Sequence, residues 1–191
     1  MKLIPLNKDE VTSLYNERMQ DDFIKDELKP LWVIHNAMDE GIYEPLGLSD
    51  GSALLGYAFI VKQEKNYLVD YLAVFPGVRN QGVGTKMLRL LESHLSDAEM
   101  IMLEVEDPAF AENEMQESQQ KRRVAFYKRN GWKDTGLRVV CFGVPFIILR
   151  SKESSPMGND LLWETYRNFY KIVLTEGKQI PLSRIIDPAD Q

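Results

Sequence analysis

Residues 67–88 read YLVDYLAVFPGVRNQGVGTKML, and this stretch decides how the chain folds. Residues 67–74 are mostly apolar, β-branched or aromatic, which predicts a β-strand. A short loop follows with Gly82 and Gly84 at its end, and the apolar residues beyond it recur at helical spacing. The stretch therefore predicts a strand, a tight loop and the first turn of a helix, in that order.

The opening of this helix is a candidate anion site. The first N–H groups of a helix have no internal partner and carry partial positive charge, so phosphates bind there. A Walker A loop would need Lys and Ser or Thr after Gly82, but Val83 and Gly84 follow instead. A dinucleotide fingerprint would need a third glycine where Met87 stands. The sequence predicts a phosphate or pyrophosphate site at residues 79–84 that matches neither loop.

A second motif lies at residues 121–132, which read KRRVAFYKRNGW. It predicts a helix that carries Phe126 and Tyr127 and ends at Gly131, because glycine readily takes the left-handed conformation that closes a helix. The chain thus has an apolar strand, then Arg79-x-x-Gly82-x-Gly84, and later the helix that carries Phe126 and Tyr127. This order of motifs resembles that of the GNAT acetyltransferase superfamily. The resemblance covers residues 1–150.

The resemblance implies an α+β (α/β) fold, in which helices flank a mixed, mostly antiparallel central sheet, here with an added C-terminal helix. Apolar periodicity supports strands at 2–5, 42–49, 53–62, 67–74, 100–105, 132–144 and 146–150, the last two meeting at Pro145. It supports helices at 7–19, 30–41, from 82 onward, at 123–130 and at 160–174. Residues 107–117 read as a polar excursion, 152–159 as a linker and 177–191 as a surface tail. The first of these helices begins with a capping-box spacing, Asn7 and Glu10.

We expect one GNAT-like domain at residues 1–150 and a C-terminal helical extension and tail at 151–191 packed on the same domain. The chain of 191 residues is long enough for one substantial core. The predicted helix at 160–174 has an apolar side, which we expect to pack on the domain. A dimer contact or a partner-binding surface are the alternatives for this helix.

Composition narrows the class of protein. The net charge of −6 disfavours nucleic acid as a partner, because domains that bind it are usually basic. No apolar run approaches the roughly 18 residues of a membrane span, and no signal-peptide core follows Met1. The one cysteine, Cys141, cannot form an intramolecular disulfide, which fits a reducing compartment. We expect a cytoplasmic protein that binds neither membrane nor metal.

The resemblance further implies transfer of an acetyl group from acetyl-CoA to a primary amine, with no metal. In this reading Tyr127 protonates the departing thiolate, and the strand at 71–74 diverges from the strand at 101–105 to admit the pantetheine arm. The implied cofactor-binding residues are Leu72, Ala73, Val74, Arg79, Asn80, Gln81, Gly82, Val83, Gly84, Thr85, Arg123 and Tyr127. Gln120 and Arg123 stand where the family often has Asn and Ala, which affects the finer contacts to CoA.

The acetyl acceptor needs a base, because a protonated amine cannot attack. Asp70 is the candidate catalytic base, since strand alternation would put it on the same face as Leu72 and Val74. Glu104 and Glu106 are rivals and candidate substrate-binding residues, and water is a further alternative. Asp70 could equally be a carboxylate at the sheet surface.

Acidic residues crowd the stretch from Glu104 to Glu117, and basic residues follow directly. This stretch is either a solvated loop or a lip that attracts a cationic acceptor. We therefore expect a cationic small molecule or peptide amine as acceptor, and a monomer or homodimer. The competing functions are a non-catalytic acyl-CoA-binding module and a partner-binding protein that works through the helix at 160–174.

Overall fold

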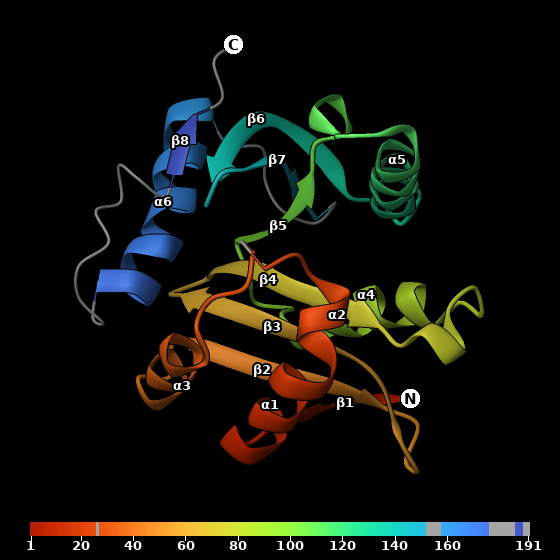
Figure 1. The fold of residues 1–191 in the computed structure, drawn as a ribbon. Helices are drawn as coiled ribbons and strands as arrows, with labels where there is room; N and C mark the ends of the chain where they lie inside the picture. Colours follow the sequence, from red (N-terminus) through yellow and green to blue (C-terminus); the bar gives the residue numbers. More distant parts are fainter. Residues whose placement is uncertain (26, 152–157, 176–185, 189–191) are drawn as a thin grey trace.

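An eight-stranded sheet of order β1-β2-β3-β4-β5-β7-β6-β8 runs through the computed structural model, which describes residues 1–25, 27–151, 158–175 and 186–188 (Figure 1). Neighbouring strands are antiparallel except for the central pair β4 and β5, which is parallel. The strands are β1 (Lys2–Pro5), β2 (Tyr43–Ser49), β3 (Leu54–Gln63), β4 (Asn66–Val74), β5 (Met100–Glu106), β6 (Lys133–Cys141), β7 (Val144–Arg150) and β8 (Ile186–Pro188). The predicted mixed, mostly antiparallel sheet of the GNAT type is confirmed.

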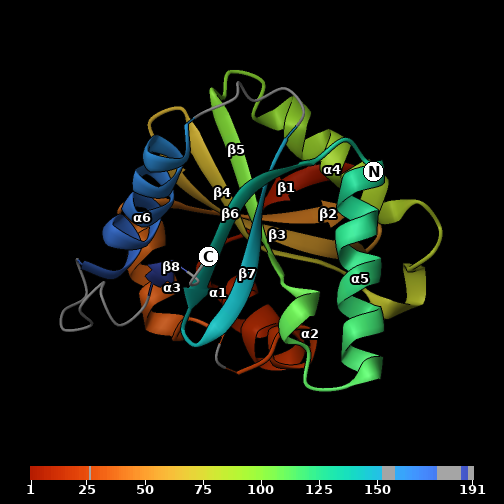
Figure 2. The same ribbon diagram turned by 90° about the horizontal axis from the view of Figure 1, so that it is seen from above.

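Helices cover both faces of this sheet, as the view from above shows (Figure 2). They are α1 (Lys8–Leu14), α2 (Gln20–Asp22), α3 (Leu31–Asp39), α4 (Val83–His94), α5 (Glu114–Arg129) and α6 (Asn159–Thr175). A π-helical stretch, η1 (Tyr15–Met19), and two short 3-10 helices, η2 (Pro76–Val78) and η3 (Pro108–Phe110), complete the helical elements described. One core packs α1, α3 and α6 against the sheet through residues such as Val11, Ile34 and Phe169. The other packs α4 and α5 through Met87 and Tyr127. Because both faces are covered, the central strands are mostly apolar, although β4 carries Asp70 and β5 carries Glu104 and Glu106.

The sheet opens between β4 and β5. These strands pair from Asn66↔Met100 to Val69↔Leu103, and beyond that point β4 stays paired with β3 alone among the described strands. The register between β3 and β4 jumps from Phe59↔Tyr71 to Ile60↔Val69, which leaves Asp70 as the extra residue of a β-bulge. Such bulges bend and twist a strand. The bulge therefore coincides with the place where the two halves of the sheet in Figure 1 separate.

Local sequence signals explain several element boundaries. The Asn7 side chain accepts hydrogen bonds from the Asp9 and Glu10 N–H groups, and Glu10 Oε2 accepts one of 2.8 Å from the Asn7 N–H. This is the predicted capping box. The predicted end of α5 is also confirmed, since Asn130 caps the helix and Gly131 has a φ of 94°.

Two predicted boundaries were wrong. Helix α5 begins at Glu114 rather than near residue 123, because Asn113 accepts a hydrogen bond from the Gln116 N–H and good helix formers follow. The hairpin of β6 and β7 turns at Phe142 and Gly143, which both have positive φ, rather than at Pro145. Pro145 lies within β7, where its carbonyl accepts from the Asp107 N–H.

The C-terminal region contributes more than a tail. Residues 186–188 form β8, which pairs with β6, whereas the rest of the predicted tail and residues 152–157 of the predicted linker lie outside the described residues. Helix α6 buries Leu162, Tyr166, Phe169 and Tyr170 in the core it shares with α1 and α3. Its apolar side is therefore occupied within the chain. Among the described residues, no helix combines the length and apolar character needed to cross a membrane.

Candidate active site

The loop before α4 has the geometry of an anion site. Asn80 and Gly82 have φ values of 63° and 79°, and Gly82 directly precedes the first residue of the helix. Among the described residues, no side chain caps this helix start. Left-handed residues next to a helix start turn successive N–H groups toward a common point, where an anion can bind. Phosphate binding by the loop at residues 79–84 stays a prediction, and this backbone geometry is compatible with it.

The two glycines of this loop serve different purposes. A Cβ built on Gly82 meets nothing within 4 Å, so this glycine is required by its positive φ. A Cβ on Gly84 would lie 3.0 Å from Cζ of Phe126 on α5. Gly84 thus allows the close approach of α4 and α5, which is a packing role.

Arg79 is tied back to the protein. Its Nε donates a 2.7 Å hydrogen bond to the carbonyl of Val74 at the end of β4. Its Nη2 lies 3.1 Å from Oδ1 of Asp22, and half of the side chain is exposed. These contacts fix the loop against β4 and leave the rest of the guanidinium open to solvent.

A cavity of about 70 Å³ lies where β4 and β5 separate. It is lined on one side by Asp70 and Leu72 of β4 and on the other by Glu104 and Glu106 of β5, and Tyr127 of α5 also lines it. The expected divergence of these strands is therefore present. The cavity brings together Asp70, Leu72, Glu104, Glu106, Arg123 and Tyr127 from the residues predicted for the site.

The Tyr127 hydroxyl belongs to a side chain that is 8% exposed and that packs edge-on against Phe126 and Trp132. Burial raises its pKa to about 12, an effect that Arg123 opposes and Glu106 reinforces. The phenol therefore stays protonated at neutral pH. A buried, protonated phenol at the edge of a cavity can donate a proton to a leaving group.

Asp70 lies on the opposite face from the one predicted. Leu68 and Tyr71, three residues apart, belong to the same core, so the bulge breaks the alternation on which the prediction rested. The carboxylate faces Lys29, whose Nζ is 2.7 Å and 2.9 Å from its two oxygens, and it also accepts a hydrogen bond from the hydroxyl of Tyr43. Both side chains of the ion pair are 2% exposed. The role of Asp70 as the catalytic base stays a prediction. The ion pair with Lys29 argues against this role, because it already occupies the carboxylate.

Lys29 was not predicted. Burial disfavours its charge, but the attraction of Asp70 and smaller contributions from Tyr71, Glu104 and Cys141 together outweigh burial and raise the pKa of the ammonium. The rings of Tyr71, Phe142 and Tyr170 surround the ammonium, with Tyr170 nearest at 4.7 Å from the centroid. No motif marks this lysine, because its partners come from distant segments. The ammonium neutralises Asp70 within the cavity wall.

The two glutamates of β5 have different partners. Oε1 of Glu104 accepts hydrogen bonds of 2.6 Å from the hydroxyls of both Tyr166 and Tyr170 of α6. Burial and then the Asp70 charge raise the pKa of Glu104 to about 7, although Lys29 and the two hydroxyls oppose the shift. Glu106 is 7% exposed and forms an ion pair with Arg123.

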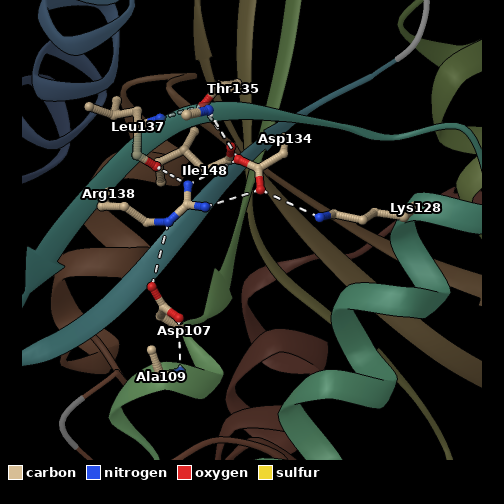
Figure 3. Close-up of polar contacts among 9 residues, drawn as sticks. Asp107, Ala109, Lys128, Asp134, Thr135, Leu137, Arg138 and Ile148 are labelled. Carbon is tan, nitrogen blue, oxygen red and sulfur yellow. Dashed lines mark hydrogen bonds and ion pairs between the residues drawn. The ribbon is translucent and has the colours of Figure 1, made fainter.

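The acidic stretch does not form one continuous negative surface. Asp107 lies 3.5 Å from Nε of Arg138, which also forms two hydrogen bonds with Asp134 (Figure 3). Glu117 pairs with Lys121 at 2.6 Å on α5. Of the acidic residues from Glu104 to Glu117, Glu104 and Glu106 on β5 line the cavity. The others are exposed or form the ion pairs described above.

Comparison with known proteins identifies the family of this chain. The sequence profile of the family described as "Acetyltransferase (GNAT) domain" matches residues 32–134, more than half of the chain. The chain belongs to the GNAT acetyltransferase family. The match contains the anion loop, both strands of the cavity and Tyr127, so the family assignment rests on the segments that build this site.

Individual relatives are more distant. An uncharacterized protein of Dictyostelium discoideum is 36% identical over 73 residues, which are 37% of this chain and 17% of that protein. Among solved structures, a GNAT-family acetyltransferase of Bacteroides thetaiotaomicron has a TM-score of 0.69 at 22% identity, covering 94% of this chain and all of the other. An aminoglycoside 6′-N-acetyltransferase complexed with coenzyme A has a TM-score of 0.56 at 15% identity, covering 79% of this chain and 96% of the other. These structural similarities establish the GNAT fold.

Proposed function

We propose that this GNAT protein is an N-acetyltransferase that moves the acetyl group of acetyl-CoA to a primary amine. One observation carries the proposal: the opening between β4 and β5 forms a cavity that Tyr127 lines. The uncapped start of α4 supplies the second requirement, an anion site next to the end of β4. A similar fold in an aminoglycoside acetyltransferase is known with coenzyme A bound, which supports the same cosubstrate here.

In this proposal the backbone N–H groups of residues 80–85 bind the pyrophosphate, with Arg79 beside them. An N–H near Leu72 or Ala73, on the edge of β4 that is not paired with β5, polarises the thioester carbonyl. Stabilisation of the developing oxyanion is usually a large part of catalysis. The Tyr127 hydroxyl gives its proton to the thiolate as the carbon–sulfur bond breaks. Its high pKa keeps that proton in place until the thiolate forms.

The acceptor in this proposal is a cationic small molecule or peptide that carries a primary amine. Four acidic side chains line the cavity, those of Asp70, Glu104, Glu106 and Glu27, compared with two cationic ones, those of Lys29 and Arg123. Burial raises the pKa of Glu27 to about 8 and that of Glu104 to about 7, so the cavity gains its excess negative charge as the pH rises through this range. This charge favours entry of an ammonium group. We also propose that α6 belongs to the catalytic unit rather than to a separate module, because two of its tyrosines bind Glu104.

Binding of coenzyme A tests the cosubstrate, with Gly82→Ala as the variant and Gly77→Ala as its control. Both glycines leave open space around an added Cβ, but Gly82 has a positive φ and Gly77 does not. A left-handed conformation costs a non-glycine residue about 1–2 kcal/mol, which corresponds to a roughly 5- to 30-fold loss of affinity if the bound loop needs it. Calorimetry should show this loss for Gly82→Ala and unchanged affinity for Gly77→Ala. Absence of binding to the unaltered protein at millimolar coenzyme A would refute the proposal.

A further inference from the structure

Glu27 is a carboxylate in the cavity wall that lacks a hydrogen-bond partner at one oxygen. It lies between α2 and α3 and lines the same cavity as Tyr127 and Glu104. Its Oε1 is buried, and no described group donates a hydrogen bond to it. A buried carboxylate oxygen without a donor is costly, so such a group in a cavity indicates a ligand that supplies the missing donor.

The backbone holds Glu27 firmly against β4. The hydroxyl of Tyr71 donates a 2.8 Å hydrogen bond to the Glu27 carbonyl and accepts one of 2.8 Å from the Lys29 N–H. The Glu27 N–H donates to the carbonyl of Ile24. The backbone of Glu27 is therefore anchored beside the bulge.

The other carboxylates of the cavity have partners. Asp70 is paired with Lys29, Glu106 with Arg123, and Glu104 accepts from two tyrosine hydroxyls. Of these four acidic groups, Glu27 is the one for which the described residues provide neither a cation within ion-pair distance nor a donor at its buried oxygen. An incoming ammonium would supply both.

We propose that Glu27 is the catalytic base, which accepts a proton from the ammonium of the acceptor, while Glu104 helps to hold that ammonium. This inference rests on the proposed acetyl transfer. The proton leaves the ammonium nitrogen for Glu27, and the freed amine forms a carbon–nitrogen bond with the acetyl carbon. As the carbon–sulfur bond breaks, the thiolate takes a proton from Tyr127, and the phenolate regains one from the second N–H of the attacking nitrogen. Glu27 releases its proton to solvent, so that acetyl amine, free thiol and one proton are formed.

The electrostatic surroundings of Glu27 suit this task. Burial raises its pKa to about 8, with Glu106 adding to the shift, Arg123 opposing it, and Glu104 and Asp70 adding smaller contributions. A base is most effective when its pKa lies near the working pH. Because only the ionised form accepts a proton, kcat/KM should rise as the pH increases toward 8 and beyond.

The test is the pH dependence of acetyl transfer by Glu27→Gln, with Glu17→Gln as the matched control at an exposed position on the preceding helical segment. We expect Glu27→Gln to lower kcat/KM by about a hundredfold or more, which is the usual contribution of a general base, and to lose the rise near pH 8. Glu17→Gln should match the unaltered protein. Calorimetry with coenzyme A should give the same affinity for all three, which shows that the fold is intact.

A second variant, Glu27→Asp, distinguishes loss of the base from a structural effect of the substitution. It keeps a carboxylate, so the pH-dependent rise should return at a reduced rate. The inference is overturned if Glu27→Gln keeps the same pH profile and an activity within a few-fold of the unaltered protein, or if Glu27→Asp does not restore the rise. If the unaltered protein binds coenzyme A but acetylates no amine, the proposed function itself fails, and the inference fails with it.

Discussion

Replacing Asp70 with Asn tests whether this carboxylate is a base or the counter-ion of Lys29. The substitution preserves size and an oxygen that can accept from Tyr43, but it leaves the Lys29 ammonium without an ionic partner. Both side chains are 2% exposed, so the remaining ammonium stays largely removed from bulk water. We expect Asp70→Asn to be strongly destabilised.

The size of the effect follows from the burial of the pair. Removing one member of a buried ion pair costs about 3–5 kcal/mol, because the remaining charge stays buried. One kcal/mol shifts the Tm of a domain of this size by about 2–4 °C, so Asp70→Asn should melt about 6–20 °C lower. The double variant Lys29→Met with Asp70→Asn removes the stranded charge and should recover most of that loss.

Thermal unfolding and acetyl transfer, measured on the same single and double variants, give the decisive comparison. If Asp70 is a counter-ion, the double variant regains activity along with stability and keeps the rise of kcat/KM near pH 8. If Asp70 is the base, the double variant folds but stays about 10²–10⁴-fold less active, which is the range of a lost general base. That second result would refute the assignment of the base to Glu27.

Two further outcomes are expected. Tyr127→Phe should lower turnover by one to a few decades while coenzyme A affinity changes little, because the hydroxyl acts as the thiolate leaves; equal turnover would remove this residue from the mechanism. Joint replacement of Glu112, Glu114 and Glu117 with Gln should raise the KM of a cationic acceptor only a few-fold at low salt and not at high salt, since these carboxylates lie outside the cavity lining and act through a screened field. A preference for neutral or anionic amines would contradict this.

Local signals in the sequence predicted much of the framework. The capping box at Asn7 and the helix end at Gly131 each require only a few neighbouring residues, so short patterns reveal them. The start of α5 was missed because residues 114–122 carry few apolar side chains, and periodicity marks a helix only where it buries an apolar face. Asn113 was the available signal for that start.

The catalytic surroundings were harder to predict, because they depend on contacts between distant segments. The bulge at Asp70 reverses the face of this residue, and nothing in the strand sequence marks it, since strand alternation assumes an unbroken register. Lys29 precedes a proline at a helix start and gives no sign of a partner 41 positions away. Glu27 likewise becomes notable only when the fold places it in the cavity that Tyr127 also lines.

Acetyl transfer itself is the most direct test of the central claim. The purified protein is incubated with acetyl-CoA and each member of a panel of polyamines, aminoglycosides, amino acids and peptides, and both free thiol and the mass of the acceptor are followed. The proposed function predicts thiol release that depends on the amine, with a matching acetylated product from a cationic acceptor. Binding of acetyl-CoA with no acetylated product from any amine would contradict it and would favour a non-catalytic acyl-CoA-binding protein.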